Sequence, residues 1–372
     1  MNSQSLTHTF HIPVMGLGYT VDTPIKVAKY GISSVISIMD DHLLEDMRKI
    51  YSKKFVREFI PIPDTDEDYR AKRITAYLDL TQSLVEEQFN KLINENWETN
   101  TEFSKYLDLL PQNTVLLDLF AKLETASDSE KFQLKEELKS KLSIGAVDVN
   151  IMTKVDKINI DKAGNELPRE YSDALSALRG FAKSKANGSV VFSAGMNPAL
   201  YGYAEHFSEF YPNQFGEISK GIILKVSDYR SALIQGKFLA KKGLWVSEFR
   251  IESGLNCGGH AFATDGFLIG PILEEFKNNR NDLFQTLFET CQGALENKEL
   301  TKLSSAPTFK ITYQGGIGTA SEDNFLREYY ELDGTGWGSP FLLVPEDTSV
   351  DDDTLERLFQ ANLTTSSATL RP

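Results

Sequence analysis

The stretch that decides the fold runs from AVDVNIMTK (146–154) through GSVVFSAGMN (188–197) to GIILKVSD (221–228). Each segment is a short β-rich run, and helical spacing follows two of them, in ALSALRGFAKS (174–184) and YRSALIQGKFLAKKG (229–243). Apolar strands that alternate with helices indicate a parallel sheet whose two faces are both covered.

The same alternation extends in both directions along the chain. Thr23-Pro24 is typical of a helix start, with Thr at the N-cap and Pro in the first turn. The other candidate strands are Ile12 to Met15, SSVISIM (33–39), GLWVSEFRI (243–251), TFKITYQGG (308–316) and GWGSPFLLVPE (336–346). Eight candidate strands favour an α/β fold of the closed (β/α)8 TIM barrel type over an open doubly wound sheet.

Residues 64–142 differ from the rest of the chain. YRAKRITAYLDLTQSLVEEQFNKLINE (69–95) and SEKFQLKEELKSKL (129–142) have apolar residues at helical spacing, and strand signals are few. We therefore expect a TIM barrel formed by 1–63 and 143–360, a helical insertion subdomain at 64–142 after the second strand, and a polar tail at 361–372.

Composition excludes several classes of function. The 372 residues contain 39 Lys+Arg and 53 Asp+Glu, a net charge of −14, so binding to nucleic acid or to an anionic membrane surface is not expected. Two cysteines cannot form a disulfide framework, and neither a signal peptide nor an apolar run of about 20 residues is visible. We expect a cytoplasmic protein with a small-molecule substrate and no metal, and a homodimer is compatible with this.

Ligands of such barrels bind at the carboxyl ends of the strands. Asn150 lies inside an apolar strand, where its amide is either a satisfied core group or a ligand contact. Lys225 lies in IILKVS, where a lysine is rarely left unpaired; Asp228 or Glu252 could be its structural partner.

Glycines follow the last two candidate strands, in QGGIG (314–318) and GTGWGS (334–339). Glycine turns beside helix starts at these two places form the usual phosphate site of a barrel, because backbone N–H groups can approach an anion closely. Tight turns without a ligand would give the same sequence pattern. The pair of turns favours a ligand that carries a phosphate.

The ordered set of motifs resembles a known family. FHIPVMGLG (10–18), VDVNIMTK (147–154), VVFSAGMNP (190–198), ESGLNCGGHAF (252–262) and TYQGGIGTA (312–320) occur in the order and spacing of the nitronate monooxygenases, formerly called 2-nitropropane dioxygenases. These enzymes are related to flavin-dependent enoyl-acyl-carrier-protein reductases. The resemblance covers roughly residues 10–45 and 145–345 and implies an FMN-binding TIM barrel.

The resemblance also implies roles for single residues. His260 would be the catalytic base, since it matches the histidine that acts as base in nitronate-oxidising members. The residues assigned to the cofactor, with Lys225 and Gly259 added from their positions, are Met15, Gly16, Asn150, Lys225, Gly258, Gly259, Gly316, Gly318, Gly336, Trp337, Gly338 and Ser339. Of these, the stretch from Gly336 to Ser339 would hold the phosphate.

The chain departs from the family pattern at two places. Leu255-Asn256-Cys257 lengthens the loop before Gly-Gly-His, which could displace His260. Cys257 is either a nucleophile activated by the nearby histidine or a small buried residue. Without the family resemblance, His260 would be interpreted as a loop histidine that caps backbone groups. The helical insertion could cover the site and alter the substrate.

Three functions follow from these observations. The first is an FMN-dependent oxidoreductase of the nitronate monooxygenase type, in which FMN carries the redox chemistry. The second is a flavin-free barrel enzyme that acts on a phosphorylated metabolite through the same glycine turns. The third is a non-catalytic flavin-binding or interaction domain, because a fold alone does not determine function.

Overall fold

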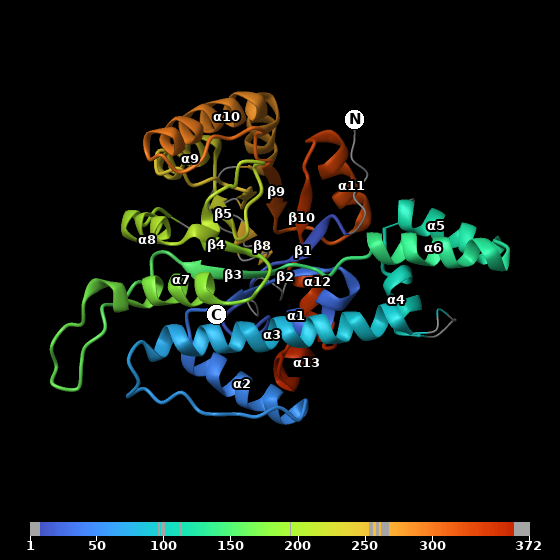
Figure 1. Ribbon diagram of the computed structural model, residues 1–372, viewed down its shortest axis with the longest axis horizontal. Helices are drawn as coiled ribbons and strands as arrows, with labels where there is room; N and C mark the ends of the chain where they lie inside the picture. Colours follow the sequence, from blue (N-terminus) through green and yellow to red (C-terminus); the bar gives the residue numbers. More distant parts are fainter. Residues whose placement is uncertain are drawn as a thin grey trace.

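Eight parallel strands form a closed barrel. The computed structural model describes residues 8–95, 97, 101–111, 114–193, 195–252 and 268–360, and of residues 128, 256–257 and 260–261 the backbone alone. The barrel strands, in order around the barrel, are β1 (Phe10–Ile12), β2 (Ser33–Ser37), β3 (Val147–Met152), β4 (Ser189–Ser193), β5 (Gly221–Val226), β6 (Glu248–Ile251), β9 (Lys310–Gln314) and β10 (Gly334–Gly336). Because β10 pairs with β1, the predicted (β/α)8 barrel is confirmed (Figure 1).

Helices connect successive strands and surround the barrel. Between β6 and β9 lie a short antiparallel hairpin, β7 (Asn256–Cys257) with β8 (His260–Ala261), and a long helix. The helices are α1 (Thr23–Val27), α2 (Asp41–Lys54), α3 (Tyr69–Asn94), α4 (Glu102–Asp108), α5 (Val115–Thr125), α6 (Asp128–Lys141), α7 (Asp173–Lys183), α8 (Pro198–Tyr203), α9 (Tyr229–Ala240), α10 (Ile269–Asn297), α11 (Ala320–Tyr329), α12 (Ser339–Leu342) and α13 (Asp352–Gln360). Among the described residues, no helix combines the length and the apolar character that crossing a bilayer requires.

The first and last strands differ from the predicted ones. The first strand is Phe10–Ile12 and not Ile12 to Met15, since Pro13 follows directly and has no N–H to continue the ladder. The last strand is Gly334–Gly336, whereas GWGSPFLLVPE contributes the short helix α12. Pro340 lies in the first turn of that helix, a position that proline favours and a central strand excludes.

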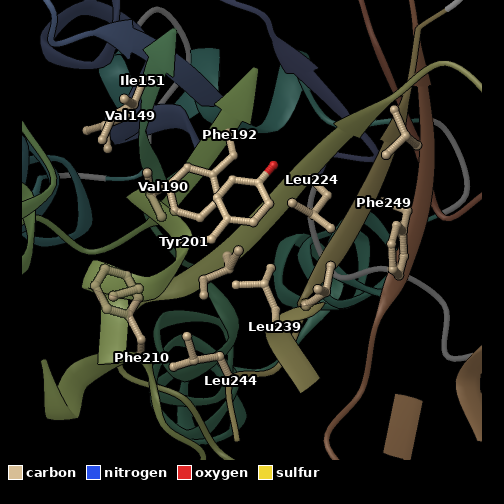
Figure 2. Packing of buried hydrophobic residues seen from close by; sticks show 14 of the residues in the cluster. Val149, Ile151, Val190, Phe192, Tyr201, Phe210, Leu224, Leu239, Leu244 and Phe249 are labelled. Carbon is tan, nitrogen blue, oxygen red and sulfur yellow. The ribbon is translucent and has the colours of Figure 1, made fainter. Parts of the chain in front are cut away.

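The main core lies between the barrel wall and the surrounding helices. Figure 2 shows Val149, Ile151, Val190, Phe192 and Leu224 packed on the helix-facing side of β3, β4 and β5. Tyr201 of α8 stacks on Phe192 with ring centroids 4.7 Å apart. Each fully buried side chain of this size contributes about 1.5–3 kcal/mol of hydrophobic stabilisation, so this layer holds the barrel strands in position.

The helices between β2 and β3 contribute to more than one hydrophobic core. The first half of α3 packs on α7 through the main core, which includes Ile74, Tyr77 and Leu78. The last part of α3, from Leu92, packs with α4, α5 and α6 around Phe103 in a second cluster. The helix α3 therefore links the two cores, and the domain boundary at residue 64 stays a prediction.

Candidate ligand site at the barrel mouth

The barrel strands present apolar side chains to the helices and many polar side chains to the lumen. Because Val149 and Ile151 lie in the helix-facing core, Asp148 and Asn150 of the same strand face the lumen. The same alternation on the other strands gives a set of polar lumen residues: His11, Ser37, Asp148, Asn150, Lys225, Glu248, Arg250, Glu252, Thr312 and Gln314. Barrels of this type usually fill the lumen with branched apolar side chains, so each polar group here needs a partner or a purpose.

Four of these residues form a lower cluster towards the amino ends of the strands: Asp148, Glu248, Arg250 and Thr312. Arg250 Nε lies 2.7 Å from Glu248 Oε1, and its Nη2 lies 3.6 Å from Asp148 Oδ2. The Thr312 hydroxyl donates to the same Glu248 oxygen at 2.6 Å, and Asp148 accepts from the backbone N–H of Ser189 at 2.8 Å. The buried charges of the lower cluster therefore satisfy one another.

The pKa values of the lower cluster reflect burial and this pairing. Burial raises the pKa of Asp148 to about 6, against the opposing attraction of Arg250. Burial alone would also raise the pKa of Glu248, but the charge of Arg250 and its hydrogen bond outweigh burial and lower that pKa to about 2. Glu248 is therefore the firmly ionised partner of Arg250, as its shorter contact indicates.

A second chain of contacts lies at the carboxyl ends of the strands. Lys225 Nζ lies 2.7 Å from Glu252 Oε2, and Gln314 Nε2 donates to Glu252 Oε1 at 2.7 Å. Gln314 Oε1 lies 3.2 Å from His11 Nε2. Because the Gln314 oxygen accepts, His11 must carry its proton on Nε2. Of the two partners considered for Lys225, Glu252 is the one it contacts, whereas Asp228 caps α9 by accepting from Ser231 N at 2.7 Å.

His11 is the buried end of this chain. Burial, reinforced by the positive charge of Arg250, lowers the pKa of His11 to about 3. The imidazole is therefore neutral near pH 7, and it donates to Gln314 without adding a charge to the lumen.

Asn150, Lys225 and Gln314 lie at one level of the barrel. They come from the alternate strands β3, β5 and β9, and the register between these strands, with the stagger of an eight-stranded barrel, brings them to the same height. We call these three residues, together with Ser37 and Glu252, the mouth layer. The mouth layer forms the polar floor of the barrel end at which such folds bind ligands.

Two polar atoms of the mouth layer have no hydrogen-bond partner among the described residues. Ser37 and Asn150 are register neighbours on β2 and β3, and they are only 3% and 2% exposed. Within the described part of the chain, Asn150 Oδ1 and Ser37 Oγ form no hydrogen bond. A buried acceptor left unsatisfied costs about 1–3 kcal/mol, so this pair marks a place where a ligand group would complete the structure.

The glycine turn after β9 is partly occupied by the protein itself. Gly315 and Gly316 have φ values of 103° and 71°, which favour glycine. The backbone N–H groups of Gly318 and Thr319 both donate to Glu322 Oε2 at 2.9 Å, in a capping box that starts α11. A phosphate at Gly318 would therefore have to displace a carboxylate. Because the Gly315 N–H donates to Gly336 O at 3.3 Å, Gly316 is the part of this turn left for an anion.

The residues after β10 serve the barrel wall as well as any ligand. A Cβ on Gly336 would lie 2.5 Å from Gln314 Cβ and 2.6 Å from His11 Nε2, so glycine permits the close approach of these two side chains. The Trp337 indole donates to Thr335 Oγ1 at 2.9 Å and packs against the main core. Gly338 and Ser339 begin α12. Their assignment to phosphate stays a prediction.

Met15 and Gly16 follow β1. Met15 is 1% exposed and packs with Val27 and Leu342 in a small cluster outside the barrel lumen. Gly16 has a φ of 59° in the loop that follows. Met15 therefore supports α1 and α12 through its side chain, and a contact with the cofactor ring stays a prediction.

The loop after β6 holds the predicted base. Gly258 and Gly259 lie outside the described residues, as do the side chains of Cys257 and His260. The backbone of Cys257 pairs with that of His260 in the β7–β8 hairpin. The catalytic role of His260 and the role of Cys257 remain predictions. Within the described residues, no group of three or more His, Cys, Asp or Glu is arranged to hold a metal ion.

The helices α4 to α6 lie at the opposite end of the barrel from the mouth layer. Tyr30 and Lys29 both contact Glu102 Oε2, at 2.6 and 2.5 Å, and the Tyr106 hydroxyl donates to Ser143 O at 3.0 Å. Tyr30 and Ser143 shortly precede β2 and β3, so these contacts lie at the amino ends of the strands (Figure 1). The expectation that the insertion could cover the site is therefore wrong for these helices.

Sequence reasoning missed Ser37, His11 and Gln314 as site residues and considered Glu252 only as a partner of Lys225. A signal for them exists, because polar residues occupy every second position in VDVNI (147–151), EFRIE (248–252) and KITYQ (310–314). Such alternation with a period of two indicates that one face of the strands is polar. In a barrel that is covered by helices, this polar face is the lumen.

Comparisons with known proteins give distant likenesses. No protein-family model matches the chain, and no curated protein matches its sequence. Among solved structures, it is similar to an IMP dehydrogenase/GMP reductase-like protein from Corynebacterium glutamicum, with 12% identity and a TM-score of 0.36 over 90% of this chain and 64% of that one. It is also similar to a nitroalkane oxidase from Streptomyces ansochromogenes, with 8% identity and a TM-score of 0.38 over 94% of this chain and 70% of that one.

A third solved structure is the enoyl reductase domain from the macrolactin biosynthesis cluster of Bacillus amyloliquefaciens, with 13% identity and a TM-score of 0.37 over 62% of this chain and 49% of that one. The chain thus spans less than two thirds of the first and third of these proteins. Because all three TM-scores lie under 0.5, the likenesses carry no argument about function.

Proposed function

We propose that this protein is a flavin-dependent oxidoreductase and that the flavin ring binds against the mouth layer. The observation that supports this most is the buried, unpartnered pair of Asn150 Oδ1 and Ser37 Oγ. A flavin offers an imide edge, in which one N–H lies between two carbonyl oxygens. The N–H would donate to the unpartnered acceptors, and a carbonyl oxygen would accept from the Lys225 ammonium at the same level of the barrel.

FMN is the flavin that the family resemblance implies. Its phosphate would lie between Gly316 and the start of α12, since the N–H of the neighbouring Gly315 is occupied by Gly336 O. Glu322 limits this site on one side, since it occupies the N–H groups of Gly318 and Thr319. The residues present therefore suit the flavin ring. Of the two glycine turns predicted to bind the phosphate, only part remains available for it.

The chain and the cofactor would divide the chemistry. Bound flavin would accept and donate the electrons. Lys225 would hold the electron-rich edge of the ring through its positive charge, and Asn150 and Ser37 would orient it. His260, the base that the resemblance implies, would take a proton from a carbon next to an electron-withdrawing group of a small organic substrate. We include in this proposal that the substrate is a nitronate, which the protein would oxidise by this route.

The first test is the identity of any molecule that co-purifies with the protein. We expect a yellow protein that releases FMN on denaturation, identified by its absorbance spectrum and its mass. Colourless protein is then titrated with FMN while the flavin fluorescence is followed. A protein that neither carries flavin nor quenches FMN fluorescence at concentrations up to roughly 1 mM would contradict the proposal. Stabilisation by phosphorylated sugars in its place would favour the flavin-free barrel enzyme.

A further inference from the structure

Glu252 is fully engaged by the protein. Its Oε2 is bound to the Lys225 ammonium and its Oε1 to the Gln314 amide, both at 2.7 Å. A carboxylate that accepts on both oxygens, one of them from a cation, is held in one orientation by these two contacts. Its geometry instead fixes the position of the lysine beside it.

Lys225 is engaged on one side only. An ammonium group has three N–H donors, and among the described residues Lys225 contacts one partner, Glu252. The Lys225 side chain is 11% exposed, so few of the remaining donors can be satisfied by bulk water. Lys225 also shares its level of the barrel with Asn150, whose Oδ1 lacks a partner.

We propose that Glu252 is a positioning residue that holds the Lys225 ammonium as a fixed cation in the mouth layer, facing a negatively charged or strongly electron-rich ligand atom. Gln314, which is itself held by His11, orients Glu252 through the carboxylate oxygen that does not contact Lys225. This inference rests on the proposed function for the identity of the ligand, which is then the carbonyl edge of the flavin. The ligand class it defines is one that offers an anionic or carbonyl oxygen to Lys225 and an N–H to Asn150.

His11, at the buried end of the contacts that run through Gln314 to Glu252, suits this role. His11 is neutral near pH 7, so it does not repel the lysine, and its protonated Nε2 holds the Gln314 amide in one orientation. That orientation directs Nε2 of Gln314 to Glu252. A flipped amide would place an oxygen against the carboxylate, which both groups disfavour.

The pairing can be tested in protein without cofactor. Lysines are labelled with acetic anhydride, and the extent of labelling at each position is measured by mass spectrometry. We expect Glu252→Gln to raise the labelling of Lys225 by roughly tenfold, because the ion pair that holds the Lys225 nitrogen in place and shields it from the reagent is lost. Lys220 is the internal control, since it is also buried but donates to Ala186 O at 2.9 Å and forms no ion pair with any carboxylate of the described residues. The conservative Glu252→Asp should return the ratio of the two labels towards the wild-type value.

Two outcomes would overturn the proposal. The first is an unchanged ratio of Lys225 to Lys220 labelling in folded Glu252→Gln protein, with folding checked by circular dichroism. The second is FMN affinity that is the same in wild type and Glu252→Gln although the labelling ratio has changed. Failure of wild-type protein to bind FMN would contradict only the proposed function, because the labelling result does not depend on flavin. Glu322→Gln, which removes a carboxylate outside the lumen, should leave the labelling of Lys225 unchanged.

Discussion

The two ends of the barrel lumen are both polar, but they differ in how completely their groups are paired. In the lower cluster, Arg250 lies between two carboxylates, and one of these also accepts from Thr312. In the mouth layer, the Lys225–Glu252 pair lies at the level of Asn150, whose oxygen has no partner in the described structure. A closed network specifies the fold, whereas an open network of the same residue types is expected where a ligand completes it.

The comparison predicts that polar-to-apolar substitutions act in opposite directions at the two ends. Removal of a partner from a satisfied buried network leaves charges without compensation. Removal of a group that already lacks a partner relieves a cost that the folded protein carries without ligand. Stability measured without ligand and affinity measured with ligand should therefore separate the two ends.

The largest effect is expected for Arg250→Met. This substitution leaves Asp148 and Glu248 buried without their cation, and breaking such a network costs about 3–5 kcal/mol. Denaturant unfolding followed by circular dichroism measures the change. A loss of less than about 1 kcal/mol would show that the lower cluster does not hold the barrel together.

A smaller effect is expected from the pH dependence that His11 imposes. Its pKa is about 3 in the folded protein against 6.5 as the ordinary value, so the unfolded chain takes up a proton first as the pH falls. Stability due to His11 is therefore complete above pH 6.5 and is lost as the pH falls towards 3. The loss between pH 6.5 and 5 is about 2 kcal/mol.

His11→Asn provides the matched measurement for this effect. Asp148 acts in the opposite direction, because its raised pKa of about 6 means that stability falls as the pH rises from about 4 through 6. The difference between wild type and His11→Asn isolates the histidine from this opposing contribution. Equal dependence on pH in the two proteins would contradict a neutral, buried His11.

Asn150→Leu is expected to change stability less, and in the favourable direction. Without ligand, the free energy of unfolding should rise by about 1 kcal/mol, because the unpartnered amide oxygen is removed at similar volume. Flavin affinity should fall in the same variant. Destabilisation by more than about 1 kcal/mol would mean that Asn150 is a satisfied core amide, the alternative that the sequence left open.

The smallest effect is expected for Glu322→Gln. The substitution weakens the capping box at the start of α11, an exposed feature worth less than about 1 kcal/mol. It also removes a negative charge beside the glycine turn, so FMN affinity should stay the same or increase. Weaker FMN binding in Glu322→Gln would contradict a phosphate site next to this turn.

The sequence predicts the barrel well because its signals are local. Strands such as VVFS (190–193) and helices such as α7 carry their own periodicity, and eight of these units can close in few ways. The ends of the barrel are harder, since β1 and β10 have three residues each and end near Pro13 and Pro340. In the sequence, a long apolar run such as FLLV (341–344) gives a stronger strand signal than Gly-Thr-Gly, which forms the actual strand.

The candidate site is less predictable because it depends on register. Asp228 and Glu252 both lie at a strand end near Lys225, and only the pairing of β5 with β6 decides which carboxylate the lysine meets. The contact between His11 and Gln314 joins residues 303 positions apart, and it requires that the barrel be closed. Alternating polar residues indicate a polar lumen, but they do not identify which members lack partners.

The measurement that tests the central claim most directly is the binding of FMN to wild type and to Asn150→Leu, followed in parallel by quenching of flavin fluorescence. The mouth layer as a flavin site predicts saturable binding by wild type and at least roughly tenfold weaker binding by Asn150→Leu, although that variant is the more stable protein without ligand. Equal affinities, or no saturable binding by wild type, would contradict it.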